Sequence, residues 1–145
     1  MHNWFECSLK YEKVMENGLE KKVTELYLVD ALSITEAEAR LIEEMNPFMQ
    51  GEFQCKGIKE AKYSEIFFSE EVTADRYFKC KLLFITLDEK SGKEKTTSTQ
   101  ILVQAADLRD AVKKLDEGMK GTMADYQIAS VSETKIMDVY PYESK

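Results

Sequence analysis

The stretch NWFECSLKY (Asn3–Tyr11) decides the fold, because it returns as RYFKCKLLF (Arg76–Phe84), 73 positions later in a chain of 145 residues. In both stretches apolar and polar side chains alternate, which is the pattern of a half-buried β-strand. A sequence that returns at a fixed spacing is typical of a duplicated structural unit. The first expectation is therefore a chain that contains two copies of one unit.

Two further blocks return in the same order and at nearly the same spacing. VDALSITEAEARLIEEM (Val29–Met45) aligns without a gap with VQAADLRDAVKKLDEGM (Val103–Met119). FQCKGIKEAKYSEIFF from Phe53 matches YQIASVSETKIMDVYP from Tyr126. Chance similarity explains three ordered blocks poorly, so we predict an internal duplication.

Each repeat has the signals of two strands, a helix and a further strand. Asn17-Gly18 predicts a hairpin turn, because both residues tolerate φ > 0. Ser33 and Asp107 are expected to cap the two helices, and Ser33 with Glu36 forms a capping box. The expected apolar stripes of the helices are Ile34, Ala37, Leu41 and Met45 in the first copy, and Leu108, Ala111, Leu115 and Met119 in the second.

The long final strand of each repeat carries an irregularity, because its apolar alternation reverses partway along. The reversal predicts a bulge or bend at Lys56-Gly57 and at Ala129-Ser130. The expected fold is α+β: a ββαβ unit at residues 1–72 and a second at 73–145, together one compact domain. Two such units related by a pseudo-twofold can bury a common core. We expect an antiparallel sheet, continuous or split, with two helices packed on it.

The charge of the chain is distributed unevenly. The net charge is −7; residues 1–72 hold 8 Lys and Arg against 15 Asp and Glu, whereas residues 73–145 hold 12 of each kind. This acidity disfavours general nucleic-acid binding. No apolar run is long enough to span a membrane and no signal peptide is recognisable, so we expect no membrane partner and a cytoplasmic location.

The residue types of common catalytic and metal sites are scarce. The only histidine is His2, which excludes His-rich metal sites and Ser-His-Asp triads. Cys7, Cys55 and Cys80 are interpreted as small apolar residues rather than nucleophiles or ligands. We therefore predict no catalytic, cofactor-binding or metal-binding residue. A carboxylate-based enzyme or a small-ligand site at the seam between the repeats stays an alternative.

An apolar stripe distinguishes the second repeat from the first. Leu83, Ile85 and Leu87 lie on the strand face opposite the core, where the first copy has polar residues. A strand that is apolar on both faces has to be covered on both, here either by another part of the chain or by another subunit. The first hypothesis is therefore a non-catalytic interaction or assembly module, homo-oligomeric through this stripe, with no further partner identified.

Single-stranded nucleic-acid binding is the alternative hypothesis. Trp4 and Tyr77 are expected as equivalent outward aromatic rings, with Lys79 and Lys81 beside the second. Stacking rings along a basic strand are what such binding requires. The acidic charge of the chain argues against this hypothesis, which we do not favour.

The segments NWFECSLKYEKVMENG, LYLVDALSITEAEARLIEEM, KLLFITLDEKSGKEKTT and the stretch from ILVQAADLRD to MDVYPY resemble an uncharacterised family of unknown function from bacteria and their phages. The resemblance covers essentially the whole chain. It implies no catalytic residue, cofactor or substrate, and a phage or mobile-element connection slightly favours the nucleic-acid or assembly hypotheses.

Overall fold

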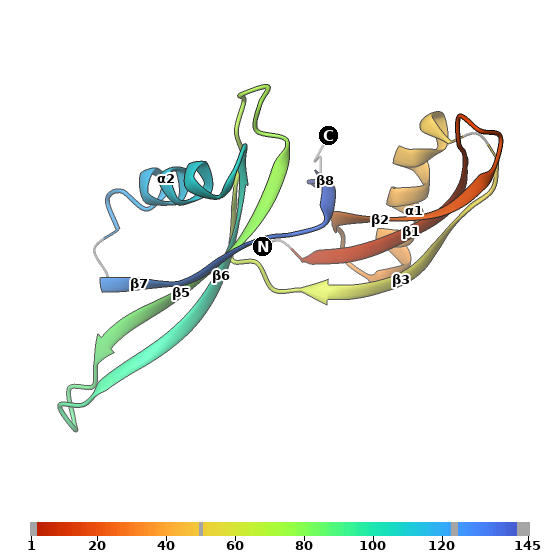
Figure 1. Cartoon of the computed structure of the whole chain (residues 1–145). Helices are drawn as coiled ribbons and strands as arrows, with labels where there is room; N and C mark the ends of the chain where they lie inside the picture. Colours follow the sequence, from red (N-terminus) through yellow and green to blue (C-terminus); the bar gives the residue numbers. More distant parts are fainter. Residues whose placement is uncertain (1–2, 50, 123–124, 142–145) are drawn as a thin grey trace. The chain divides into compact units, whose positions relative to one another are not determined.

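The structure is a computed structural model that describes residues 3–49, 51–122 and 125–141. The chain forms two compact units: unit 1 comprises residues 1–62 and 135–145, and unit 2 comprises residues 63–134. Figure 1 labels the elements in chain order. His2 lies outside the described residues.

Unit 1 is a four-stranded sheet with one helix on it (Figure 1). Its strands lie in the order β3-β1-β2-β8, with β1 antiparallel to both neighbours and β8 parallel to β2. Its elements are β1 (Trp4–Val14), β2 (Glu20–Asp30), α1 (Ile34–Met45), the short 3-10 helix η1 (Asn46–Phe48), β3 (Phe53–Ala61) and β8 (Ile136–Tyr140).

Unit 2 has the corresponding arrangement, with strands in the order β4-β6-β5-β7 and β4 parallel to β6. Its elements are β4 (Glu65–Phe67), β5 (Arg76–Leu87), β6 (Glu94–Ala105), α2 (Leu108–Gly118) and β7 (Asp125–Glu133). The α+β class, the two helices and the mainly antiparallel pairing are thus confirmed in the described residues. The strands form two separate sheets, each with one parallel pair.

The capping residues begin the helices as predicted. The backbone N–H of Glu36 donates to Ser33 Oγ at 3.1 Å, and that of Asp110 donates to Asp107 Oδ1 at 2.8 Å. Each bond satisfies a backbone N–H that the first helical turn leaves without a partner. The caps therefore fix where α1 and α2 begin.

The predicted bulges are confirmed. Along β1 the partner of Ser8 is Gly57 but the partner of Leu9 is Cys55, so Lys56 is an extra residue in β3. Along β5 the same shift falls between Lys81 and Leu82, and Ala129 is the extra residue in β7. Each extra residue shifts the alternation of side chains by one position, so the same face of the strand is reached at odd spacing across the bulge. This explains the reversed alternation in the sequence.

The hairpin at Asn17-Gly18 forms, but its turn differs from the prediction. Of these two residues only Gly18 adopts a positive φ, of 81°, and no non-glycine residue does so among the described residues. Asn17 Oδ1 instead accepts from the backbone N–H of Leu19 at 3.1 Å. The backbone N–H of Met15 donates to the carbonyl of Leu19, so the loop consists of residues 16–18, one residue more than in the two-residue hairpin typical of Asn-Gly. Glycine supplies its left-handed position.

The prediction of one long final strand in each repeat is wrong. After β3 the chain breaks at residues 62–64 and continues as β4, which pairs in the sheet of unit 2. After β7 it breaks at residues 134–135 and continues as β8, which pairs in the sheet of unit 1. Thr134 marks one break, where its N–H and Oγ1 both donate to the carbonyl of Tyr77. Each sheet is therefore completed by a strand from the other half of the sequence.

Each unit has its own apolar core between sheet and helix. Ala37, Leu41 and Met45 of α1 pack in one core, and Ala111, Leu115 and Met119 pack in the other. The expected stripes were one residue too long, because Ile34 and Leu108 are 54% and 51% exposed in the first turns. Strand residues complete the cores: Phe5, Cys7, Leu9, Tyr27 and Val29 in unit 1, and Phe78, Cys80, Leu82, Ile101 and Val103 in unit 2.

Candidate functional site

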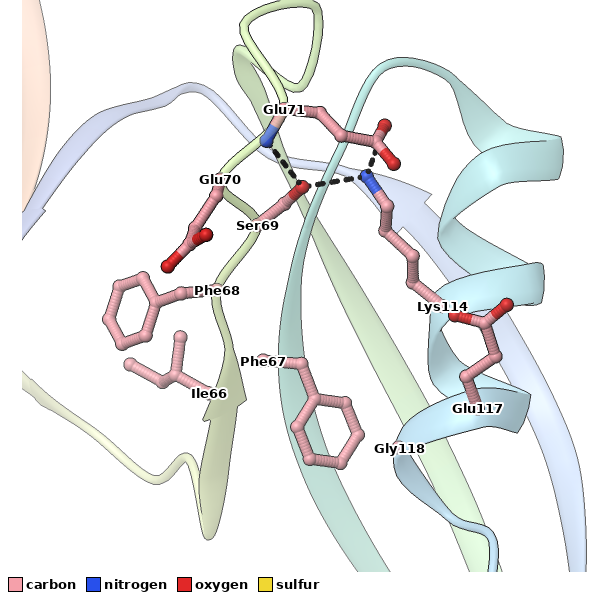
Figure 2. Close-up of a pocket in the computed structure, with 9 residues that line it drawn as sticks. All are labelled: Ile66, Phe67, Phe68, Ser69, Glu70, Glu71, Lys114, Glu117 and Gly118. Atoms are coloured by element: carbon pink, nitrogen blue, oxygen red, sulfur yellow. Dashed lines mark hydrogen bonds and ion pairs between the residues drawn. The ribbon is translucent and has the colours of Figure 1, made fainter.

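A depression in unit 2 lies between α2 and the segment around β4 (Figure 2). Its polar centre is Lys114, which is mostly buried and pairs with Asp110 at 2.9 Å and Glu71 at 3.2 Å. Lys114 Nζ also donates to Ser69 Oγ at 3.0 Å. Below them the ring of Phe67 lies against Gly118 so closely that a Cβ there would come within 2.5 Å of it.

The pair Ser69 and Lys114 resembles a nucleophile with its base, but its electrostatics argue against that role. Burial lowers the pKa of Lys114. The hydrogen bonds and charges of Asp110 and Glu71 raise it by more, so the pKa lies above its ordinary value. A lysine that stays protonated cannot accept the proton of a serine hydroxyl. Lys114 therefore acts as a structural clamp on the segment after β4.

The corresponding helix position in unit 1 has the same structural role. Arg40 of α1 donates to the carbonyl oxygen of Asp30 and, at 3.0 Å, to that of Pro141, which follows β8. In both units a helix cation thus holds the chain that follows the parallel edge strand. This similarity makes the depression of unit 2 a part of the fold rather than a ligand site.

A second depression, of about 630 Å³, lies at one end of the unit 1 sheet and is lined by aromatic, methionine and acidic residues. We call it the tyrosine depression; its lining residues are Tyr11, Glu12, Lys13, Val14, Glu25, Tyr27, Met45, Phe48, Met49, Met137, Asp138 and Tyr140.

The carboxylate of Glu25 is the polar centre of the tyrosine depression. Tyr27 Oη donates to Glu25 Oε1 at 3.1 Å. The ring of Tyr27 stacks on that of Tyr140, with centroids 5.9 Å apart and an interplanar angle of 23°. Tyr140 Oη in turn donates to Met45 Sδ at 3.6 Å. No lysine or arginine among the described residues pairs with Glu25, which is half-buried.

The phenols around Glu25 are held in their protonated form. Burial and then the negative charge of Glu25 raise the pKa of Tyr11 and of Tyr27. Burial, Asp138, Glu44 and Glu25 together raise the pKa of Tyr140 to about 12. A tyrosine that serves as a general base needs a lowered pKa, so this arrangement favours binding over proton transfer.

At three positions of the matching corner, unit 2 has side chains that do not ionise. The register pairs Leu9 with Glu25 and the matching Leu82 with Thr99. Cys7 likewise lies opposite Tyr27, whereas Cys80 lies opposite Ile101. On the parallel edge, Val29 has Tyr140 as its partner, and Val103 has Phe67. The tyrosine hydroxyls and the Glu25 carboxylate are therefore not needed to pack this corner of the fold.

The predicted apolar stripe lies on the face of β5 opposite the core. Leu83 and Ile85 are half-buried, and Leu87 at the end of the strand is 71% exposed. Their cross-strand partners on β6 are Ser98, Thr96 and Glu94, so the stripe has polar neighbours. Oligomerisation through this stripe stays a prediction.

The expected exposure of the two aromatic rings is contradicted. Trp4 is 5% and Tyr77 4% exposed, so neither offers a free ring face for a base to stack on. Lys81 is exposed and Lys79 is half-buried on the strand that carries Tyr77. The alternation correctly placed Trp4 and Tyr77 on the strand face away from the core. Alternation alone does not distinguish an exposed face from a covered one.

The cysteines are buried or half-buried thiols without disulfides. Burial raises the pKa of Cys80 to about 11, and burial with the neighbouring Cys55 raises that of Cys7 to about 12. These values do not suit a nucleophile, which needs a lowered pKa. Within the described ranges, no group of three or more His, Cys, Asp or Glu side chains could hold a metal ion.

Sequence reasoning missed the residues of the tyrosine depression. Tyr11 and Tyr27 fall on the core face of their strands, where aromatic residues are ordinary and attract no attention. The available signal was the difference between matched positions, because Glu25 corresponds to Thr99 and Tyr140 to Phe67.

Comparisons with known proteins assign no activity. Residues 3–142 match the family model described as Domain of unknown function (DUF4494). No curated protein and no solved structure matches the chain. No helix in the described part of the chain has the length and apolar character that crossing a membrane requires.

Proposed function

The chain belongs to the DUF4494 family, whose function is unknown, and we propose a function from the geometry of its candidate sites. It is a non-catalytic binding module that recognises an organic cation in the tyrosine depression. One observation carries this proposal. Glu25 and the surrounding phenols occupy a corner that unit 2 fills with Thr99, Ile101 and Phe67. Because packing does not require the Glu25 carboxylate and the tyrosine hydroxyls, we attribute them to ligand binding.

The chemistry of the depression fits an ammonium or guanidinium group. A half-buried carboxylate without a basic partner attracts a cation more strongly than an exposed one, because the surrounding dielectric is lower. Aromatic rings attract organic cations through their negative faces, and methionine sulfur adds a polarisable apolar wall. A hard metal ion such as Ca²⁺ would need six or more oxygen ligands, which this apolar lining does not provide.

The proposal is tested with n-butylammonium as the cation and n-butanol as a neutral analogue of similar shape. Titration into the isotope-labelled protein should shift the NMR signals of Tyr27, Tyr140 and their neighbours at millimolar n-butylammonium, because an isolated small cation binds weakly. n-Butanol should shift them much less. Added salt should weaken the binding, since the attraction is electrostatic.

Glu25→Gln is the decisive variant, because it keeps the shape of the side chain and removes its charge. We expect its affinity for n-butylammonium to fall about tenfold or more, as for loss of a charged hydrogen bond. Glu60→Gln removes an equal charge from an exposed position of β3 and should bind as the wild type does. Equal affinities of Glu25→Gln and the wild type would refute the proposal.

The similarity of the two units is part of the same proposal. We infer that the two halves of the sequence arose by duplication, supported by matching strand order, matching helix caps and bulges at equivalent places. Differences between the copies then indicate differences in use, and one group of them lies in the tyrosine depression. The pseudo-twofold relation stays a prediction.

A further inference from the structure

We infer that the cation bound in the tyrosine depression is a lysine side chain of a partner protein, presented between apolar residues of an extended segment. This inference rests on the proposed function and names its ligand. It follows from the rim of the depression rather than from its floor.

The rim of the depression consists of large apolar side chains that face solvent. Val14 is 67% exposed, Phe48 75% and Met137 54%, and all three line the depression. They come from three separate elements, the end of β1, the 3-10 helix η1 and β8. Single exposed apolar residues are ordinary on protein surfaces, but several around one depression mark an interaction site.

A free small cation would not use this rim. A molecule the size of n-butylammonium reaches Glu25 and the rings beside it, and it leaves most of Phe48 and Met137 in water. A polypeptide that inserts one side chain lays its neighbouring residues against the rim and removes this apolar surface from water. The rim therefore favours a cation that is part of a larger molecule with apolar groups beside the charge.

The charges around the depression indicate the charge that its ligand carries. Among the described residues, its lining holds the carboxylates Glu12, Glu25 and Asp138 and one cation, Lys13. Glu44 of α1 is close enough to help raise the pKa of Tyr140. An acidic depression with an apolar rim complements a basic side chain that is flanked by apolar ones.

Lysine suits this site better than arginine. Its ammonium is a compact charge on a flexible alkyl stem, so it can reach one carboxylate past methionine and tyrosine side chains. A guanidinium binds best to a carboxylate that is open to two parallel hydrogen bonds. Here one oxygen of Glu25 already accepts from Tyr27.

The probe that tests this inference is the blocked peptide acetyl-Leu-Ser-Lys-Ser-Leu-amide. In an extended segment its leucines lie on the same side as the lysine, because side chains alternate along a strand. Two control peptides replace the lysine by glutamine or both leucines by serine. Calorimetry or NMR titration should show the parent peptide binding about tenfold tighter than either control and than n-butylammonium, through the added apolar contact.

The variants Phe48→Ser and Met137→Ser separate this inference from the proposed function. Both residues are exposed, so the variants should fold, and a matched amide spectrum verifies that they do. They should weaken peptide binding several-fold and n-butylammonium binding much less, because the rim residues mainly contact the residues on either side of the lysine. If n-butylammonium binds but the peptide binds no tighter, or binds the rim variants equally well, the partner inference is wrong and the cation site stands. If neither probe binds, both are wrong.

Discussion

Glu25 supplies the charge of the proposed cation site in a fold that does not require a charge at this position. The residue faces the core side of β2, where its counterpart Thr99 is uncharged. A carboxylate there costs stability through partial desolvation, and the Tyr27 hydroxyl replaces one of the lost hydrogen bonds with water. Such a cost is understandable at a binding site and unexplained elsewhere.

The tyrosines of the depression predict how stability depends on pH. The pKa of Tyr140 is raised from the ordinary value of 10.0 to about 12, and that of Tyr27 is raised as well. The folded state therefore prefers the protonated phenols, and this contribution is complete below pH 10. It is lost as the pH rises through the folded-state values.

We therefore expect the free energy of unfolding to fall steeply above pH 10. Tyr140→Phe keeps the ring that stacks on Tyr27 and removes the ionisable group, so its stability should fall less over the same range. Urea unfolding followed by circular dichroism below and above this pH gives the comparison. Parallel pH profiles for the two proteins would contradict the assignment.

At the scale of elements, β4 shows how a very short strand is held in place. It has only three residues, Glu65–Phe67, which pair with Ile101–Val103 of β6. Its added support comes from the ring of Phe67 on Gly118 and from the Lys114 clamp on Ser69 and Glu71. The absence of a side chain at Gly118 is thus a packing requirement of β4.

Gly118→Ala should destabilise unit 2. The new Cβ would lie 2.5–2.8 Å from three carbons of the Phe67 ring, which has to move off α2. Overpacking of this kind costs about 1–3 kcal/mol, and the gain in helix propensity returns less than about 1 kcal/mol, so a net loss is expected.

Gly57→Ala is the matched control for this substitution. Its new Cβ would meet nothing within 4 Å. Urea unfolding should therefore give Gly57→Ala a stability equal to or slightly above that of the wild type. Both substitutions reduce the freedom of the unfolded chain, so this effect cancels when the two variants are compared. A Gly118→Ala protein as stable as Gly57→Ala would show that the contact with Phe67 does not constrain position 118.

At the scale of the whole molecule, the two sheets share strands reciprocally between the halves of the sequence. β4 belongs to the sheet of unit 2 and β8 to that of unit 1. Hydrogen exchange can test this pairing, because amides open together with the cooperative unit to which they belong.

Leu41→Ala and Leu115→Ala are the matched pair for that test. Both leucines are fully buried helix residues, one in each core, so each substitution should cost about 2–5 kcal/mol. Leu41→Ala should speed the exchange of β8 and leave β4 protected, and Leu115→Ala should do the reverse. If β4 follows Leu41→Ala instead, the strand assignment is wrong.

The sequence was sufficient for the local elements and insufficient for their partners. Alternation, caps and turn residues predicted both hairpins, both helices and the bulges at Lys56 and Ala129, because these depend on nearby residues. The exchange of β4 and β8 depends on which distant edge accepts a strand, and no local pattern encodes that. The buried state of Trp4 and Tyr77 was missed for a similar reason.

The reciprocal exchange also limits how such a chain can be divided. A cut between residues 72 and 73 respects the sequence repeat, yet each fragment would then lack the edge strand of its own sheet and carry the edge strand of the other. Each fragment would expose one side of β2 or β6 as an open edge, the kind of edge that recruits foreign strands. Either half expressed alone would therefore carry both an open sheet edge and a strand without its partner.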